Sequence, residues 1–230
     1  MVAASILPYS QVFINTGDAI DREDLLEFRL LYEGELLASG NNGHPKAKHA
    51  IRRKLHPQLR RQWTLHSGLR QLAANAGNQA AANIARTEPE WFEIGIGAIG
   101  KQWARNGYEF IPLVTAEHAV RCSLDILLLR PGEKTLLFTQ GDIDGQVKTL
   151  FDALRIPDSL KEAGDMGPQE DETPFYCLLS DDKLISEVRV NADELLLLPT
   201  ERRVKSCDAF AVIHVRLNYK RPGVFDRYLD

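Results

Sequence analysis

The chain has 230 residues, 44% of them hydrophobic and 26% charged, which is ordinary for a globular protein with a sizeable core. Three widely spaced cysteines, Cys122, Cys177 and Cys207, indicate neither a disulfide framework nor a zinc site, so we expect a reducing, cytoplasmic environment. No apolar run approaches the roughly 20 residues that a membrane span needs, and the N-terminus lacks the basic region of a signal peptide. We therefore expect no membrane partner.

The net charge of −4 conceals an uneven distribution. Residues 36–87 contain no Asp or Glu and carry nine Lys or Arg, whereas residues 158–194 carry eleven acids against three bases. This split is typical of a protein that attracts a polyanion with one part and holds cations with another. The alternative is that the two segments pair with each other. If the basic segment binds nucleic acid, the candidate residues are Lys46, Lys48, Arg52, Arg53, Lys54, Arg60 and Arg61.

The first half of the chain predicts an arm, one strand and a helical segment. Residues 1–24 show weak periodicity and are expected to form an N-terminal arm, followed by an apolar and aromatic strand at 25–37. From about residue 46 a helix is expected, in which Pro57 either kinks the helix or begins a second one. Its apolar face consists of residues at four-residue steps, namely Ile51, Leu55, Leu59 and Trp63.

The Ala/Asn/Gln-rich stretch 68–86 is either helical or loose. The three glycines of the stretch 91–103 argue against a regular helix. Two neighbouring strands are expected next, at 108–114 and 119–131.

The second half opens with an apolar helical face formed by Val147, Leu150, Phe151 and Leu154. A polar loop is expected at 161–174, followed by an apolar run, an alternating strand at 183–192 and a strong strand at 208–219. Strands mixed with a few helices predict an α/β or α+β fold, with a small mixed sheet and flanking helices.

Two pairs of aspartates stand out against this framework. Asp142 and Asp144 precede the apolar helix, and one side-chain cap is all that a helix start needs. Asp181 and Asp182 precede the alternating strand; if that strand lies beside the one ending near Arg130, its acids can lie next to the helix start. Converging carboxylates repel each other unless a divalent cation relieves the repulsion, and Mg²⁺ or Mn²⁺ prefers such oxygen ligands.

Lys148 lies one helical turn after Asp144 and can face the same site. An ammonium group there can hold a phosphate during phosphoryl transfer. Structural roles remain open for each group: Asp144 as a helix cap, an i, i+4 ion pair between Lys148 and Asp152, and a turn at Asp181–Asp182.

The stretch DIDGQVKTLFDAL, followed downstream by DD before a strand, resembles the RusA-type Holliday junction resolvases. Their motif is D-x-D-N, a lysine four residues beyond the second Asp, a D-A-L helix and then a paired aspartate; Gly145 stands here in the place of the Asn. The strand FRLLYEGELLASGNN also looks like their first strand and its loop. The resemblance covers roughly residues 25–42 and 108–218, and it leaves 43–107 as a basic helical insertion within a single domain at 25–230.

The resemblance implies a Mg²⁺-dependent (or Mn²⁺-dependent) homodimeric endonuclease that cuts branched DNA. Asp142, Asp144 and Asp182 would match the family's metal-binding aspartates, with Asp181 as their neighbour, and Lys148 would match the catalytic lysine. The alternative is a non-catalytic nucleic-acid-binding or regulatory module on the same scaffold.

Overall fold

The computed structural model describes the following residues of the chain: 26–39, 44–80, 87–118, 120–131, 143–165, 167–196 and 208–219. The expected arm at 1–24, the predicted ligand Asp142 and Cys207 lie outside the described residues.

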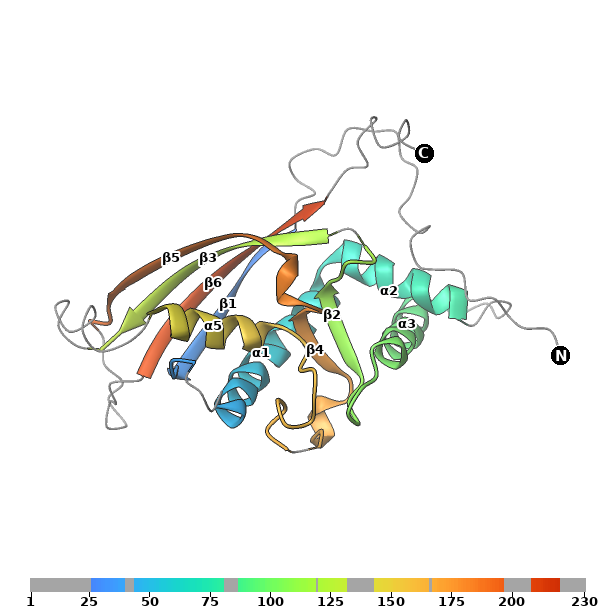
Figure 1. The fold of residues 1–230 in the computed structure, drawn as a ribbon. Coiled ribbons are helices and arrows are strands. Elements are labelled where there is room, and N and C mark those ends of the chain that lie inside the picture. The colour runs from blue at the N-terminus through green and yellow to red at the C-terminus, as the bar shows by residue number, and fades with distance from the viewer. Residues whose placement is uncertain are drawn as a thin grey trace, which may run out of the picture.

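The main feature of the fold is a mixed four-stranded sheet in the order β1-β6-β3-β5 (Figure 1). Strand β6 (Asp208–Tyr219) is antiparallel to both β1 (Glu27–Glu35) and β3 (Val120–Arg130), whereas β5 (Ile185–Glu194) is parallel to β3. A separate two-stranded parallel sheet consists of β2 (Phe110–Val114) and β4 (Phe175–Leu179). The predicted mixed α/β class is confirmed.

Helices α1 (Pro45–Leu65) and α5 (Ile143–Leu154) lie on one face of the main sheet (Figure 1). The four residues of the predicted face of α1 are all at most 2% exposed, because their four-residue spacing keeps them on the side that packs into the core. The helix continues through Pro57 to Leu65. The helical segment predicted after the first strand is thus confirmed, and it extends into α2 (Ser67–Ala80) and α3 (Glu88–Gln102).

The expectation that residues 91–103 avoid a regular helix is wrong. Glycine is required there because α2 and α3 cross with their backbones in contact. A Cβ atom added at Gly95 would lie 1.7 Å from the Ala73 carbonyl oxygen, and one at Gly77 would lie 2.1 Å from the carbonyl oxygen of Trp91. The local cost of glycine in a helix is therefore offset by a close helix crossing.

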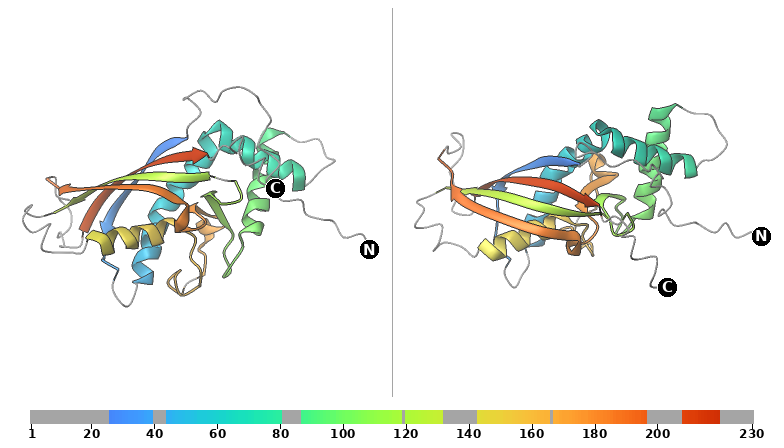
Figure 2. Two further views of the ribbon diagram at one scale, coloured as in Figure 1. Left: turned by 45° about the horizontal axis from the view of Figure 1, so that its top comes forward. Right: turned by 90° about the horizontal axis from the view of Figure 1, so that it is seen from above.

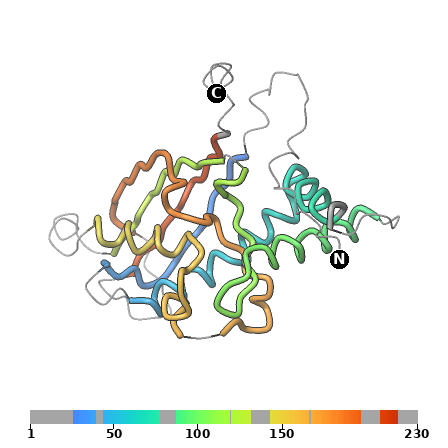
Figure 3. The backbone as a smooth tube through the Cα atoms, turned by 45° about the vertical axis from the view of Figure 1, so that its right-hand side comes forward, coloured from blue at the N-terminus to red at the C-terminus, as the bar shows by residue number. Residues whose placement is uncertain are grey.

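The expectation that 108–114 and 119–131 are neighbouring strands is also wrong. Strand β2 pairs with β4 and β3 pairs with β5 and β6, so the two consecutive strands belong to different sheets. Strands β2 and β4 are buried along their whole length, and their aromatic residues Phe110 and Phe175 form a second small core with Tyr108. Residues 161–174, expected as a loop, contain turns and a short 3₁₀ helix, η3 (Glu170–Glu172), and fold against α1 (Figure 3).

Candidate functional site

The start of α5 is fixed to the segment that follows β1 by two hydrogen bonds. Ser39 N–H donates to the Gly145 carbonyl at 2.8 Å, and the Gln146 side chain donates to the Leu36 carbonyl at 2.9 Å. These contacts bury Gly145 and Gln146, whereas Asp144 in the first turn stays exposed. Asp144 thus lies within the helix and holds its carboxylate toward solvent.

Lys148 is exposed one turn further along α5. The alternative pairing of Lys148 with Asp152 is absent among the described residues, because Asp152 instead contacts Lys48 Nζ of α1 at 2.6 Å. Lys148 therefore remains available to a negatively charged ligand.

Asp181 and Asp182 lie between β4 and β5, where Asp181 caps the short 3₁₀ helix η4 (Asp182–Leu184). The Lys183 backbone N–H donates to Asp181 Oδ1 at 2.9 Å, and this bond is the main cause that lowers the pKa of Asp181. The pKa of Asp182 is raised by partial burial and by a hydrogen bond to the Asp181 carboxylate. The structural role at a turn is thus confirmed for Asp181.

Asp144 and Asp182 lie toward opposite ends of α5. Because β5 is parallel to β3, its acids lie near the start of β3, whereas α5 follows the end of β3 and runs back along the sheet (Figure 1). Asp182 senses the charges of Arg155 and Asp152, and Asp152 lies eight residues after Asp144, or about 12 Å along a helix axis. The described residues bring no group of three His, Cys, Asp or Glu together in a way that could hold a metal ion.

Arg52, predicted to bind nucleic acid, is instead 2% exposed and lies at the C-terminal end of α5. Its guanidinium donates to the carbonyl oxygens of Asp152 at 2.5 Å, Arg155 at 3.3 Å and Glu162 at 2.8 Å. The last carbonyls of a helix have no partner within it and carry partial negative charge, so a cation there is favourable. The prediction that Arg52 faces nucleic acid is wrong for this reason.

Three further residues of the basic segment are also engaged within the molecule. Arg53 contacts buried Glu172 of η3 at 2.5 Å, Lys48 is paired with Asp152, and Lys54 donates to the Glu33 carbonyl. The alternative that the basic and acidic segments pair with each other is therefore supported at Arg53, whereas Lys48 and Lys54 contact residues outside the acidic segment.

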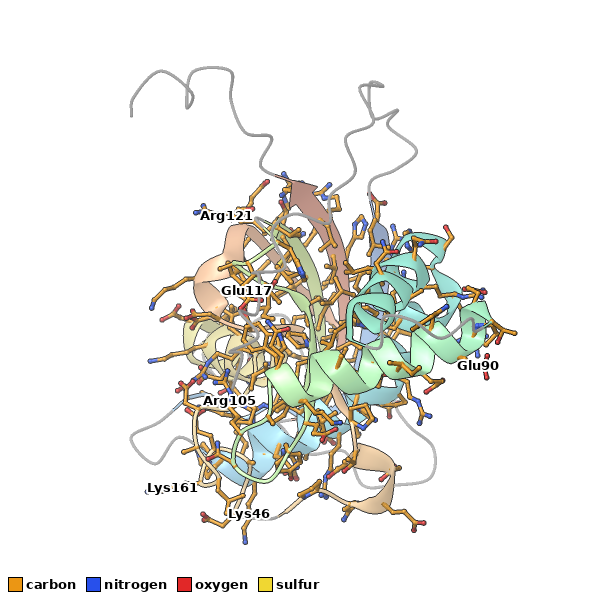
Figure 4. The ribbon with its side chains drawn as sticks, turned by 90° about the vertical axis from the view of Figure 1, so that its right-hand side faces the viewer. Lys46, Glu90, Arg105, Glu117, Arg121 and Lys161 are labelled. Carbon is orange, nitrogen blue, oxygen red and sulfur yellow. The ribbon has the colours of Figure 1, made fainter. Side chains whose placement is uncertain are left out.

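Four of the predicted nucleic-acid-binding residues are exposed, namely Lys46, Lys54, Arg60 and Arg61. Lys54 is already bonded to the Glu33 carbonyl. Lys46 lies at the corner of the molecule that also carries Lys161 (Figure 4). Arg60 lines a hollow of about 280 Å³ between α1 and η3 together with Arg53, His56 and Asp171. These exposed cations are the part of the segment that a polyanion can reach.

Two buried histidines of α1, His49 and His56, contact β4. His56 Nδ1 accepts the Tyr176 backbone N–H at 2.9 Å while Nε2 lies 3.1 Å from the Asp171 carbonyl, which defines a neutral ring. Burial lowers the pKa of His56, and burial followed by the charges of Arg53 and Arg52 lowers that of His49 to about 4.

Comparison with protein-family models, curated proteins and solved structures found no match. In the part of the chain that the structure describes, no helix combines the length and the apolar character needed to cross a membrane.

Proposed function

We propose that this chain is a divalent-metal-dependent endonuclease that hydrolyses phosphodiester bonds in branched DNA, with Asp181 and Asp182 as ligands of its principal Mg²⁺ or Mn²⁺ ion. The observation that carries the proposal is the pair of adjacent carboxylates at the turn before the edge strand β5, where Asp181 caps η4 and Asp182 is its first residue. Two adjacent carboxylates offer oxygen ligands to one divalent cation, and such a cation relieves the repulsion between their negative charges.

The donor set fits the ion. Mg²⁺ commonly binds through one or two carboxylates and completes its shell with water and substrate phosphate oxygens. Such an ion supplies an activated water and offsets the charge that develops on the phosphate. Exposed Lys148, one turn before Asp152, contributes a cation that can hold the phosphate. We assign Asp144, with Asp142 before it in the sequence, to a second ion, because Asp144 and Asp182 lie toward opposite ends of α5.

The DNA partner and the assembly follow from the same proposal. Symmetric cleavage of a four-way junction requires two active sites related by a two-fold axis, so we propose a homodimer. Exposed Lys46, Arg60 and Arg61 supply the phosphate contacts. A cytoplasmic location fits the free thiols of Cys122 and Cys177.

A cleavage assay on four-way, flapped and linear DNA with Mg²⁺ or Mn²⁺ tests the proposal. Asp182→Asn should lower the rate by at least about 100-fold, because removing one charge weakens the metal site. Asp165→Asn is the matched control: Asp165 is exposed at φ 58°, a conformation that Asn tolerates well. Wild-type activity in Asp182→Asn, or no metal-dependent cleavage by the wild type, would overturn the proposal.

A second candidate is a non-catalytic nucleic-acid-binding module. It is favoured by the wide separation of Asp144 from Asp182, since a shared three-carboxylate centre is absent among the described residues. Tight junction binding by the wild type without cleavage in either metal would select this alternative.

A further inference from the structure

Strand β5 is an open edge of the main sheet. Its ten residues pair with β3 on one side, and within the described residues no strand borders the other side (Figure 2). The Leu195 N–H donates to the Arg130 carbonyl of β3. Because backbone groups alternate in direction along a strand, the N–H and C=O of Val188 and Val190 point away from β3, toward the open edge.

The opposite edge of the sheet, at β1, is blocked by α1. The Gln58 side chain accepts the Leu31 N–H at 2.9 Å and donates to the Leu31 carbonyl at 2.7 Å, so that its amide satisfies the strand as a neighbouring backbone would. Lys54 donates to the Glu33 carbonyl in the same row. Proteins block edge strands in such ways because an open edge recruits another strand.

Among the residues that the structure describes, no comparable protection of β5 is found. Its sequence ISEVRVNADE contains neither Lys nor Pro, the residues that commonly blunt an edge. The Val188 side chain is 41% exposed, whereas Val190, two residues later on the same face, packs against the core. A long open edge with an exposed apolar residue is suited to pairing with a further strand.

The charges around Val188 are self-complementary. In an antiparallel pair of two β5 strands centred on Val188, Glu187 of each copy lies directly opposite Arg189 of the other. Opposite charges in such positions stabilise a strand pair, and like charges destabilise it. The neighbouring registers are unfavourable. A pair centred on Arg189 or on Glu187 places that residue opposite its own copy, and a pair centred on Val190 places Glu187 opposite Asp193, so that like charges face each other in each case.

We propose that β5 pairs with β5 of a second copy about a two-fold axis at Val188, joining two four-stranded sheets into one continuous sheet. Each Val188 then exchanges both backbone hydrogen bonds with its counterpart, because its N–H and C=O point outward. This interface rests on the homodimer of the proposed function. An isologous contact of this kind closes on itself and limits the assembly to two copies.

Sedimentation equilibrium on the full chain tests the interface without measuring cleavage, so the dimer and the nuclease activity can fail separately. The wild type should be a dimer at micromolar concentration. Arg189→Glu and Glu187→Arg should each raise the dimer dissociation constant at least about tenfold, since each replaces two opposite-charge pairs by like-charge pairs. The double variant Glu187→Arg/Arg189→Glu restores complementarity and should recover most of the affinity.

Two further variants distinguish the interface from a loss of folding. Val188→Pro removes an outward N–H without removing a bond to β3, so it should yield a folded monomer by circular dichroism. Arg29→Glu, exposed on β1 at the far edge of the same sheet, should leave the dimer unchanged. A monomeric wild type, a Val188→Pro dimer as tight as the wild type, or a double variant no tighter than the singles would overturn the proposal.

Discussion

The carboxylate of Asp152 contacts Lys48 of α1 at 2.6 Å rather than Lys148, which lies one turn before it on the same helix. This ion pair fastens the last turn of α5 to α1. Arg52 adds hydrogen bonds to the carbonyls of Asp152 in that turn, of Arg155 just after it, and of Glu162 in the segment that follows. The basic residues of α1 that point inward therefore hold α5 in place, and Lys148 stays exposed for the proposed chemistry.

Replacing Arg52 should destabilise the fold strongly. Arg52→Met keeps much of the apolar volume and removes the hydrogen bonds to the end of α5, so we expect a loss of about 3 kcal/mol in the free energy of unfolding. Arg60→Met, exposed two turns later on α1, should change it by less than about 0.5 kcal/mol. Urea unfolding of both variants provides the measurement, and equal stabilities would contradict this role of Arg52.

The helix crossing predicts opposite effects for two neighbouring glycines. Gly95→Ala places a Cβ atom 1.7 Å from the Ala73 carbonyl oxygen, which should cost about 1–3 kcal/mol or more as α2 and α3 move apart. Gly97→Ala meets no atom within 4 Å and should stabilise α3 by about 0.5–1 kcal/mol. Thermal and urea unfolding measure the stability of both variants. If both substitutions destabilise the protein, the close helix crossing is not the reason for the glycine at position 95.

Periodicity was sufficient to predict α1, α5, β1 and β6, because each carries a clear apolar face or alternation along its length. It failed at α3, where the reason for Gly95 is a contact with Ala73 of another helix. Periodicity also could not predict how Asp144 and Asp182 lie relative to each other. Whether Asp182 lies near Asp144 depends on the direction of β5, and the parallel pairing with β3 places it at the far end of α5.

The exposed and the engaged arginines of α1 should respond differently to charge reversal. Arg60→Glu/Arg61→Glu should weaken DNA binding across sequences and leave the melting temperature unchanged. The slope of log K against log salt concentration should become less steep by roughly 0.9 per lost phosphate contact. Arg53→Glu should lower the melting temperature instead, because it leaves Glu172, 2% exposed, without its ion-pair partner. An unchanged salt slope with a lowered melting point in the double variant would assign Arg60 and Arg61 to structure alone.

Acid should destabilise the fold through its buried histidines. Because the pKa of His49 is lowered to about 4 and that of His56 is also lowered, the unfolded chain binds protons below pH 6.5 that the folded chain does not. The free energy of unfolding should therefore fall between pH 6.5 and 4 for His49, by up to about 1.4 kcal/mol per pH unit. Above that range neither histidine contributes to the pH dependence.

Urea unfolding at pH 7.5 and 5 checks this expectation. His49→Phe keeps an aromatic ring between Phe175 and Tyr108 but cannot bind a proton, so its stability should depend less on pH than that of the wild type. A pH dependence equal to that of the wild type would show that His49 is not responsible.

Mn²⁺ binding shows whether Asp181 and Asp182 hold a metal ion independently of Asp144, with electron paramagnetic resonance reporting the number of bound ions. We expect Asp182→Asn to remove one ion and Asp144→Asn to remove a different one, each variant retaining the other. Loss of all bound Mn²⁺ on either substitution would indicate a single shared centre, and unchanged binding in Asp182→Asn would contradict metal binding at Asp181 and Asp182 outright.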